Sequence, residues 1–285
     1  MFDVYLPAGR HRRPLPAIVL LHGCTQTAQE FVHASRFNAV ADRNGVVLVL
    51  PHQEPRHHAR RCWRWYEAGH QRRGAGEPGA IAGIVGDVVA ERRRWRVDST
   101  RVYVAGLSAG GAMALVLAAT YPDLFAAAGV HAAPPFRSAT RADQALHVMA
   151  GRGIVPPPRP GEAMVPVVVV QGTADTVVRP GNAERIVEQW LAHQGEQPTR
   201  TRTRTGRTAD GRSYTVRRWY RARGRAVLEC WTVQGLGHAW SGGRPGASFA
   251  DPAGPRAATL MWTFFRRHHL AGQSVPASPA SRARS

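Results

Sequence analysis

The sequence GLSAG at residues 106–110 places Ser108 between two glycines, and a third glycine follows at position 111. Residues 102–105 suit a buried strand, and the apolar run from Ala112 suits a helix that ends near Pro122. A sharp turn from strand to helix exposes the serine hydroxyl and needs glycines beside it, because a Cβ atom there would collide with the adjoining strand or helix. The pattern predicts that Ser108 is a nucleophile, although GxSxG alone also arises by chance among 29 glycines.

A serine hydroxyl is a weak nucleophile and needs a base, whose tautomer a carboxylate then fixes. His238 lies in a glycine-flanked loop after the last expected strand, and Asp175 follows the apolar strand at residues 165–170. The order Ser, Asp, His along the chain is that of α/β-hydrolase enzymes. We therefore predict that Asp175 and His238 complete a triad with Ser108. An aspartate after a strand is more often a turn or cap residue, which weakens the assignment of Asp175. Asp210 and Asp251 therefore remain alternative acids.

The oxyanion that forms during acyl transfer needs two N–H donors near the nucleophile. In a turn of this kind the residue after the serine, here Ala109, supplies one of them. The loop after the strand that ends in His22-Gly23 supplies the other, which assigns the second donor to Cys24. Only the backbone of Cys24 is required for this role.

Short apolar strands alternate with helical segments along most of the chain. We expect strands at residues 15–21, 46–50, 102–105, 125–131, 165–170, 214–220 and 227–232, and helices at 26–43, 78–95, 139–149, 182–193 and 253–269 besides the one after Ser108. Strands without polar alternation, separated by helices, are typical of a parallel sheet that is buried on both faces. The predicted fold class is therefore α/β, a mostly parallel sheet with helices on both faces, formed by residues 1–270 as a single domain.

Residues 51–79 are too long an irregular stretch for an ordinary connection, so we expect them to have a function. They contain Trp63 and Trp65, which together with Trp240 beside the base are predicted to form an apolar substrate groove. Burial in the core is the competing explanation for these tryptophans. The proline-rich residues 132–162 occupy the place of a cap. We expect residues 195–211 to be an exposed loop rich in arginine and threonine, and residues 271–285 to be a disordered tail.

The composition limits the kinds of partner. The formal charge is +19, but all 38 basic residues are arginine and they are scattered, a pattern more typical of a GC-rich genome than of phosphate binding. We therefore expect no nucleic-acid partner, and no membrane partner because no run of 18 apolar residues occurs. The opening MFDVY is typical of a strand already under way, which predicts a further strand and an export signal upstream of Met1. The three cysteines allow one disulfide, and their spacing is unlike that of a zinc site.

Seven motifs together resemble the polyhydroxybutyrate depolymerase family of esterases, which is close to the feruloyl and acetylxylan esterases. They are LHGCTQTAQEF, CWRWYE, HQRRGAGEPGAIAGIV, VYVAGLSAGGAMA, TYPDLFAA, QGTADTVVRPGN and GLGHAWSGG, and the likeness runs from about residue 5 to about residue 269. The resemblance implies an α/β-hydrolase, usually secreted, that cleaves ester bonds without metal or cofactor. It assigns the nucleophile to Ser108, the acid to Asp175, the base to His238 and the oxyanion donors to Cys24 and Ala109.

The same resemblance implies a disulfide between Cys24 and Cys62, because the family has a cysteine in each of these motifs. Gln171 departs from the family, in which many members have histidine at this position. The expected substrate is an ester or polyester, with soluble hydroxybutyrate oligomers and short-chain esters favoured over crystalline polymer because only residues 271–285 follow the last helix. Esters of plant cell walls are the alternative, a serine peptidase is less favoured, and a non-catalytic polyanion-binding protein is the reading from a different class. The oligomeric state does not follow from the sequence.

Overall fold

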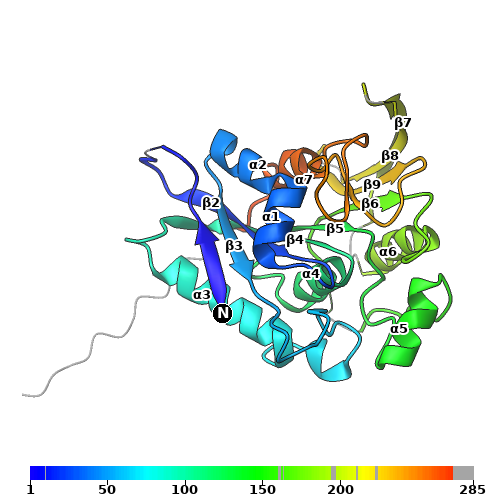
Figure 1. The fold of residues 1–285 in the computed structure, drawn as a ribbon, viewed down its shortest axis with the longest axis horizontal. Coiled ribbons are helices and arrows are strands. Elements are labelled where there is room, and N and C mark those ends of the chain that lie inside the picture. Colours follow the sequence, from blue (N-terminus) through cyan, green and yellow to red (C-terminus); the bar gives the residue numbers. More distant parts are fainter. Residues whose placement is uncertain are drawn as a thin grey trace, which may run out of the picture.

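The computed structural model describes residues 1–9, 11–159, 162, 164–193, 197–209, 211–221 and 224–271. Its centre is a nine-stranded sheet in the order β1-β3-β2-β4-β5-β6-β9-β8-β7 (Figure 1). The strands are β1 (Phe2–Tyr5), β2 (Leu15–Leu21), β3 (Val47–Pro51), β4 (Val97–Leu107), β5 (Ala127–His131), β6 (Val167–Gly172), β7 (Arg200–Arg207), β8 (Ser213–Tyr220) and β9 (Ala226–Val233). The six strands from β3 to β9 in this order are parallel, and β1, β8 and β7 pair antiparallel at the two edges.

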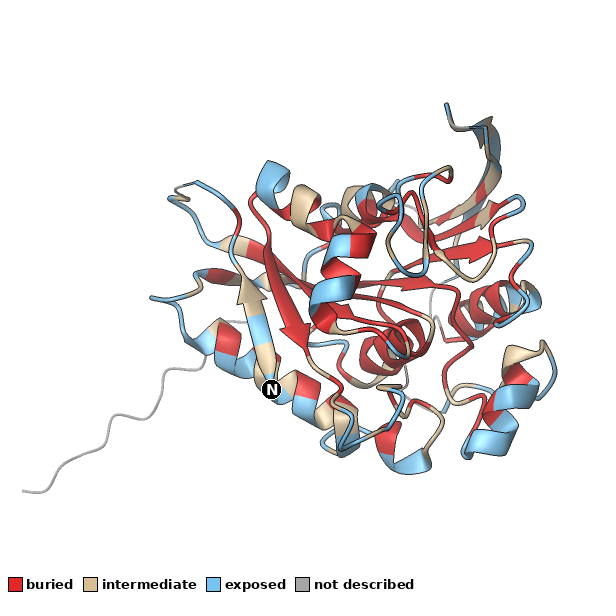
Figure 2. Ribbon diagram, in the orientation of Figure 1, coloured by how far each residue is buried: buried red, intermediate tan, exposed pale blue. Residues whose placement is uncertain are grey.

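Helices cover both faces of this sheet (Figure 1). The helices α1 (Ala28–Ser35), α2 (Phe37–Asn44) and α7 (Ala257–Phe265) contribute to the apolar cluster on one face. On the other face lie α3 (Gly76–Ala90), α4 (Ala109–Thr120), α5 (Ala142–Met149) and α6 (Gly181–Ala192), with a short 3-10 turn at Ala68–His70. Burial is greatest in the central strands and in α4 (Figure 2). The structure therefore has the predicted α/β-hydrolase architecture, and the strands β5, β6 and β9 carry almost no exposed residue because both of their faces are covered.

Two segments differ from the sequence-based expectation. The single helix expected at residues 26–43 is two helices, because Arg36 adopts a left-handed conformation with φ of 63° and ends α1 before α2 begins. The exposed loop expected at residues 195–211 was a wrong prediction, since β7 runs through it and pairs along its whole length with β8. Its residues are indeed mostly exposed. The strands were predicted from continuous apolar runs, whereas the main-chain hydrogen bonds between β7 and β8 need no apolar side chains.

The parallel strands bring their carboxyl ends to one edge of the sheet. The chain reaches Ser108 after β4, His131 at the end of β5, Asp175 after β6 and His238 after β9. A two-stranded ribbon, β10 (Trp240–Ser241) and β11 (Ala250–Asp251), follows His238 directly. Residues far apart in the sequence therefore meet at this edge, where open α/β sheets bind their ligands. The predicted tail at residues 271–285 lies outside the described residues after position 271.

Candidate active site

Ser108 occupies a strained turn between β4 and α4. Its φ of 56° and ψ of −119° are unusual for a residue with a side chain. The Ser108 N–H donates to the carbonyl of His131 at 2.9 Å, and its carbonyl accepts from Ala112 N–H at 2.9 Å, so the backbone is held on both sides. The hydroxyl is thereby presented at the carboxyl edge of the sheet while α4 starts directly beneath it.

The glycines around Ser108 are required by close packing, as the sequence predicted. A Cβ atom on Gly106 would lie 2.3 Å from the backbone of Gly110, and one on Gly110 would lie 2.1 Å from the carbonyl oxygen of Leu21. Neither contact involves a flexible side chain that could move aside. The first turn of α4 is thus pressed against both its own strand and β2, which a larger residue would prevent.

Ser108, His238 and Asp175 form one hydrogen-bonded series. Ser108 Oγ lies 3.0 Å from His238 Nε2, and His238 Nδ1 lies 2.8 Å from Asp175 Oδ2. The His238 side chain is partly exposed, whereas that of Asp175 is fully buried. The three residues come from loops after three different strands, and their contacts have the geometry that general-base activation of a serine needs.

Backbone and side-chain donors fix the carboxylate of Asp175. Its Oδ1 accepts the N–H groups of Val177 and Val178, each at 2.9 Å. Its Oδ2 faces His238 and also accepts from Gln171 Nε2 at 3.3 Å. The same Gln171 nitrogen donates to the carbonyl of Val178 at 3.0 Å, so it links the aspartate to its own loop. In the sequence Gln171 was only a departure from the family, and the structure shows that its side chain contacts Asp175.

Asp251, one of the two alternative acids, does not take this place. Asp251 lies in β11 and accepts from the Arg212 guanidinium at 2.5 and 3.1 Å, and no contact joins it to His238 within the described ranges. Asp210 lies outside the described residues. Only Asp251 can therefore be compared with Asp175, and its carboxylate binds Arg212 instead of His238.

The predicted oxyanion donors, Cys24 and Ala109, line the same cavity as Ser108 and His238. Within the described part of the chain, neither backbone N–H of these two residues donates a hydrogen bond to the protein. The loop of Cys24 is held in place by His22, whose Nδ1 donates to the Gly23 carbonyl at 2.8 Å. Burial lowers the pKa of His22 to about 4, which keeps its ring neutral at neutral pH. The N–H groups of two residues that line the cavity together with Ser108 thus have no partner in the described protein.

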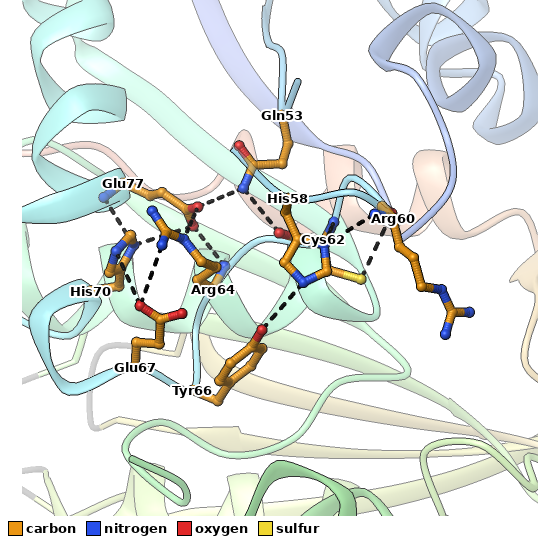
Figure 3. Close-up of polar contacts among 9 residues, drawn as sticks. All are labelled: Gln53, His58, Arg60, Cys62, Arg64, Tyr66, Glu67, His70 and Glu77. Atoms are coloured by element: carbon orange, nitrogen blue, oxygen red, sulfur yellow. Dashed lines mark hydrogen bonds and ion pairs between the residues drawn. The ribbon is translucent and has the colours of Figure 1, made fainter. Parts of the chain in front are cut away.

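A disulfide joins Cys24 to Cys62, as the resemblance implied, and Cys230 is a buried free cysteine. It connects the loop after β2 to the stretch at residues 51–79, for which the sequence analysis predicted a function. Figure 3 shows how polar contacts hold this stretch: Glu77 accepts from Gln53 Nε2 at 2.5 Å and from Arg64 N–H at 2.7 Å. The long loop is therefore fixed both by its disulfide and by the partly buried carboxylate of Glu77.

A cavity of 440 Å³ opens over Ser108 and His238. Most of its walls are apolar side chains, from the long loop, from α5 and from the segments that follow β6 and β10: Trp65, Tyr66, Pro134, Ala142, Ala145, Leu146, Met149, Val177, Val178 and Phe249. Leu146, Val177 and Phe249 are exposed at its rim, which is unusual for large apolar residues. The cavity therefore suits an apolar or weakly polar ligand.

The predicted substrate groove of three tryptophans needs correction. Trp65 lines the cavity, but Trp63 and Trp240 do not belong to its lining and are buried. Trp63 donates from Nε1 to the carbonyl of His22 at 3.1 Å, and Trp240 packs in the core with its ring stacked on that of His131, the centroids 5.0 Å apart. Both tryptophans pack behind the site and do not line the cavity. Their spacing in the sequence could not show this, because it does not tell which side chains face the core.

His131 is a buried histidine directly behind the triad that the sequence gave no reason to select. Its Nε2 accepts the N–H of Ser241 at 3.0 Å, and its carbonyl holds Ser108. Burial, followed by the proximity of His238, lowers the pKa of His131 to about 3. The ring is therefore a neutral packing and hydrogen-bonding element that joins β5 to β10.

The chain is similar to known esterases. The sequence model described as "Esterase PHB depolymerase" matches residues 1–213. A poly(3-hydroxyalkanoate) depolymerase C of Paucimonas lemoignei is 32% identical over 234 residues, which is 78% of this chain, and a probable acetylxylan esterase A of Aspergillus flavus is 32% identical over 204 residues, or 66%. These matches span only 54% and 64% of the two relatives. The solved acetyl xylan esterase from Aspergillus awamori superposes with a TM-score of 0.70 over 93% of both chains at 21% identity, which supports the fold.

Proposed function

Because the chain belongs to the esterase PHB depolymerase family, we propose that it is a serine esterase in which Ser108, His238 and Asp175 are the catalytic triad. The observation that carries the proposal is the series of two hydrogen bonds, 3.0 Å from Ser108 Oγ to His238 Nε2 and 2.8 Å from His238 Nδ1 to Asp175 Oδ2, beneath an apolar cavity. A histidine and a carboxylate in this arrangement are what activation of a serine hydroxyl requires. The positive φ of Ser108 is a backbone strain of the kind that is concentrated at active sites.

The proposed reaction has two halves. His238 Nε2 removes the proton from Ser108 Oγ as that oxygen attacks the ester carbonyl carbon, and Asp175 stabilises the imidazolium that results. The N–H groups of Cys24 and Ala109 donate to the oxyanion of the tetrahedral intermediate. The intermediate expels the alcohol, which takes its proton from His238, and leaves an acyl group on Ser108. A water molecule deprotonated by His238 then attacks this acyl group and releases the acid, which restores the enzyme without metal or cofactor.

The proposed substrates are short-chain esters of hydroxyalkanoate type, including soluble oligomers. Support comes from the cavity walls, where apolar side chains such as Trp65, Leu146 and Phe249 outnumber side chains that could bind sugar hydroxyls. Between its two ends, a chain of hydroxybutyrate units carries only ester and hydrocarbon groups, so this part of it loses little hydration in such a cavity. The name of the relative from P. lemoignei, a poly(3-hydroxyalkanoate) depolymerase, supports the same class of substrate.

Esters of cell-wall polysaccharides are the second candidate. The relative from A. flavus is named a probable acetylxylan esterase. The two candidates separate in the ratio of kcat/KM on hydroxybutyrate trimer to kcat/KM on acetylated xylo-oligosaccharide, at equal ester concentration. The apolar cavity favours the trimer.

An extracellular location is proposed from two features. The family resemblance implies secretion, and the Cys24–Cys62 disulfide is of the kind that persists in oxidising compartments. In the described part of the chain, no helix is long and apolar enough to cross a membrane.

The test of the proposed function is covalent labelling together with turnover. An organophosphate should label Ser108, and Ser108→Ala should remove the label and lower ester turnover by several orders of magnitude. The thermal midpoint should change little, because the hydroxyl makes no bond other than that to His238 among the described contacts. Full activity in Ser108→Ala would contradict the mechanism, and labelling of another serine would relocate the nucleophile.

A further inference from the structure

The cavity over Ser108 contains one unusual residue. Of the described residues that line it, only Arg60 carries a permanent charge, and none is an aspartate or glutamate. The Arg60 side chain is exposed and forms no ion pair or hydrogen bond with the described part of the protein. A free guanidinium at the edge of an otherwise apolar cavity can form charge-assisted hydrogen bonds with an anionic group of the ligand.

The acidic residues of the same loop are all engaged elsewhere. Glu54 pairs with Arg56 at 2.8 Å. Glu67 lies 3.5 Å from Arg64, and Glu77 accepts from the Arg64 backbone at 2.7 Å. In Figure 3 these two carboxylates gather around Arg64, whereas the guanidinium of Arg60 points away from the group. No glutamate of this loop therefore pairs with Arg60, which is the one arginine of the loop that lines the cavity.

The backbone of Arg60 is fixed next to the oxyanion loop. Its carbonyl accepts the N–H of Thr25 at 2.6 Å. The Cys24–Cys62 disulfide joins the same two segments next to this hydrogen bond. The neighbouring wall residue Tyr66 is held in turn by its hydroxyl, 3.3 Å from His58 Nε2. Arg60 therefore extends from a rigid support, on the side of the cavity where the ester carbonyl oxygen is expected to bind.

We propose that Arg60 binds the free carboxylate at the end of a linear ester substrate and so directs hydrolysis to the last ester bond of a hydroxyacid oligomer. The inference rests on the proposed function. In such an oligomer the carboxylate belongs to the alcohol part of the last ester, so it leaves with the hydroxyacid product. Arg60 would hold this part while Ser108 attacks the carbonyl carbon next to it. The substrate class is thus an oligomer with a free acid terminus, in preference to its neutral ester.

The test compares hydroxybutyrate dimer as the free acid with the methyl ester of the same dimer. We expect the wild type to show a kcat/KM for the acid about tenfold above that for the methyl ester, as one charge-assisted hydrogen bond provides. Arg60→Gln should bring this ratio close to one, Arg60→Lys should restore part of it, and added salt should lower it in the wild type. Arg56→Gln is the matched control, since Arg56 lies on the same loop, pairs with Glu54 and does not line the cavity. It should keep the wild-type ratio.

Two results overturn the inference in distinguishable ways. If the wild type hydrolyses both dimers but Arg60→Gln keeps the wild-type ratio, Arg60 does not bind the carboxylate, and the proposed esterase function stands. If the wild type hydrolyses neither dimer nor any other ester, the proposed function fails and the role of Arg60 fails with it. A lowered ratio in Arg56→Gln as well would assign the effect to the overall charge of the loop.

Discussion

Among the residues of the site, Asp175 is the one whose role has competitors. We expect Asp175→Asn to lower kcat by a factor on the order of 10⁴, because the amide would favour the wrong tautomer of His238. The fold should persist, since an asparagine oxygen can still accept from Val177 and Val178. The measurement is kcat on a soluble ester, with circular dichroism to verify folding. Asp251→Asn is the control and should keep its activity, because Asp251 pairs with Arg212. A loss in Asp251→Asn without one in Asp175→Asn would reassign the acid.

Gln171 is expected to position the acid without touching the substrate. Gln171→Leu removes the donor to Asp175 Oδ2 and to the Val178 carbonyl. We predict that kcat falls about tenfold while KM stays constant, consistent with one lost hydrogen bond to a charged group. Gln189→Leu is the matched control: Gln189 is equally buried, and it binds both backbone groups of Phe136 instead of the triad. A similar fall of kcat in both variants would show a general effect of burying leucine there.

At the scale of elements, the disulfide joins the oxyanion loop after β2 to the long loop before α3. It closes a sequence separation of 38 residues, which in the chain-entropy model stabilises the fold by about 4 kcal/mol. Cys62→Ala should therefore lower the free energy of unfolding by about this amount, measured by denaturant titration, and lower turnover as Cys24 loses its support. Mass spectrometry of the unreduced wild type should find one free thiol, that of Cys230. Three free thiols would contradict the pairing.

The glycine contacts belong to this scale too. They explain why α4 can start directly at Ser108, since a Cβ atom on Gly110 would meet the main chain of β2. The positions of helix and strand are thereby coupled to the position of Ser108. The site is as rigid as the packing of these two elements, which favours a preorganised oxyanion hole.

For the whole molecule, three buried histidines predict acid sensitivity. Burial lowers the pKa of His22 and His268 to about 4 and that of His131 to about 3. Above pH 6.5 these rings are neutral in both the folded and the unfolded chain, so they do not affect stability. As the pH falls below 6.5, the unfolded chain binds protons that the folded protein excludes, and the free energy of unfolding decreases until the folded pKa values are reached.

We expect each of these histidines to contribute up to about 1.4 kcal/mol per pH unit to this decrease. The measurement is the free energy of unfolding by urea at pH 7, 6 and 5. His268→Gln should reduce the slope, and it is the informative variant because His268 does not line the active-site cavity. A stability that is constant from pH 7 to pH 5 would contradict the burial of neutral rings.

The sequence by itself determined most of the fold and was sufficient to select Ser108, Asp175 and His238 as candidates. Continuous apolar runs marked the parallel strands, because strands covered on both faces need no polar residues. The GLSAG turn at residues 106–110 is a local feature whose glycines are dictated by contacts between adjacent elements, so it could be recognised without the structure. The order of Ser108, Asp175 and His238 follows from the order of their strands, and the structure places these three side chains in hydrogen-bonding contact.

Only the tertiary structure decided which side chains face the cavity. Trp65 lines it while Trp63 turns toward His22, although the two are nearly adjacent, because the irregular loop gives no periodic pattern from which to infer orientation. The strand β7 was missed since both its faces are exposed and its main-chain pairing leaves no trace in hydropathy. The place of Arg60 is likewise a property of the assembled loop: of the arginines in residues 51–79 it is the one that lines the cavity, and the nearby carboxylates are held by other partners.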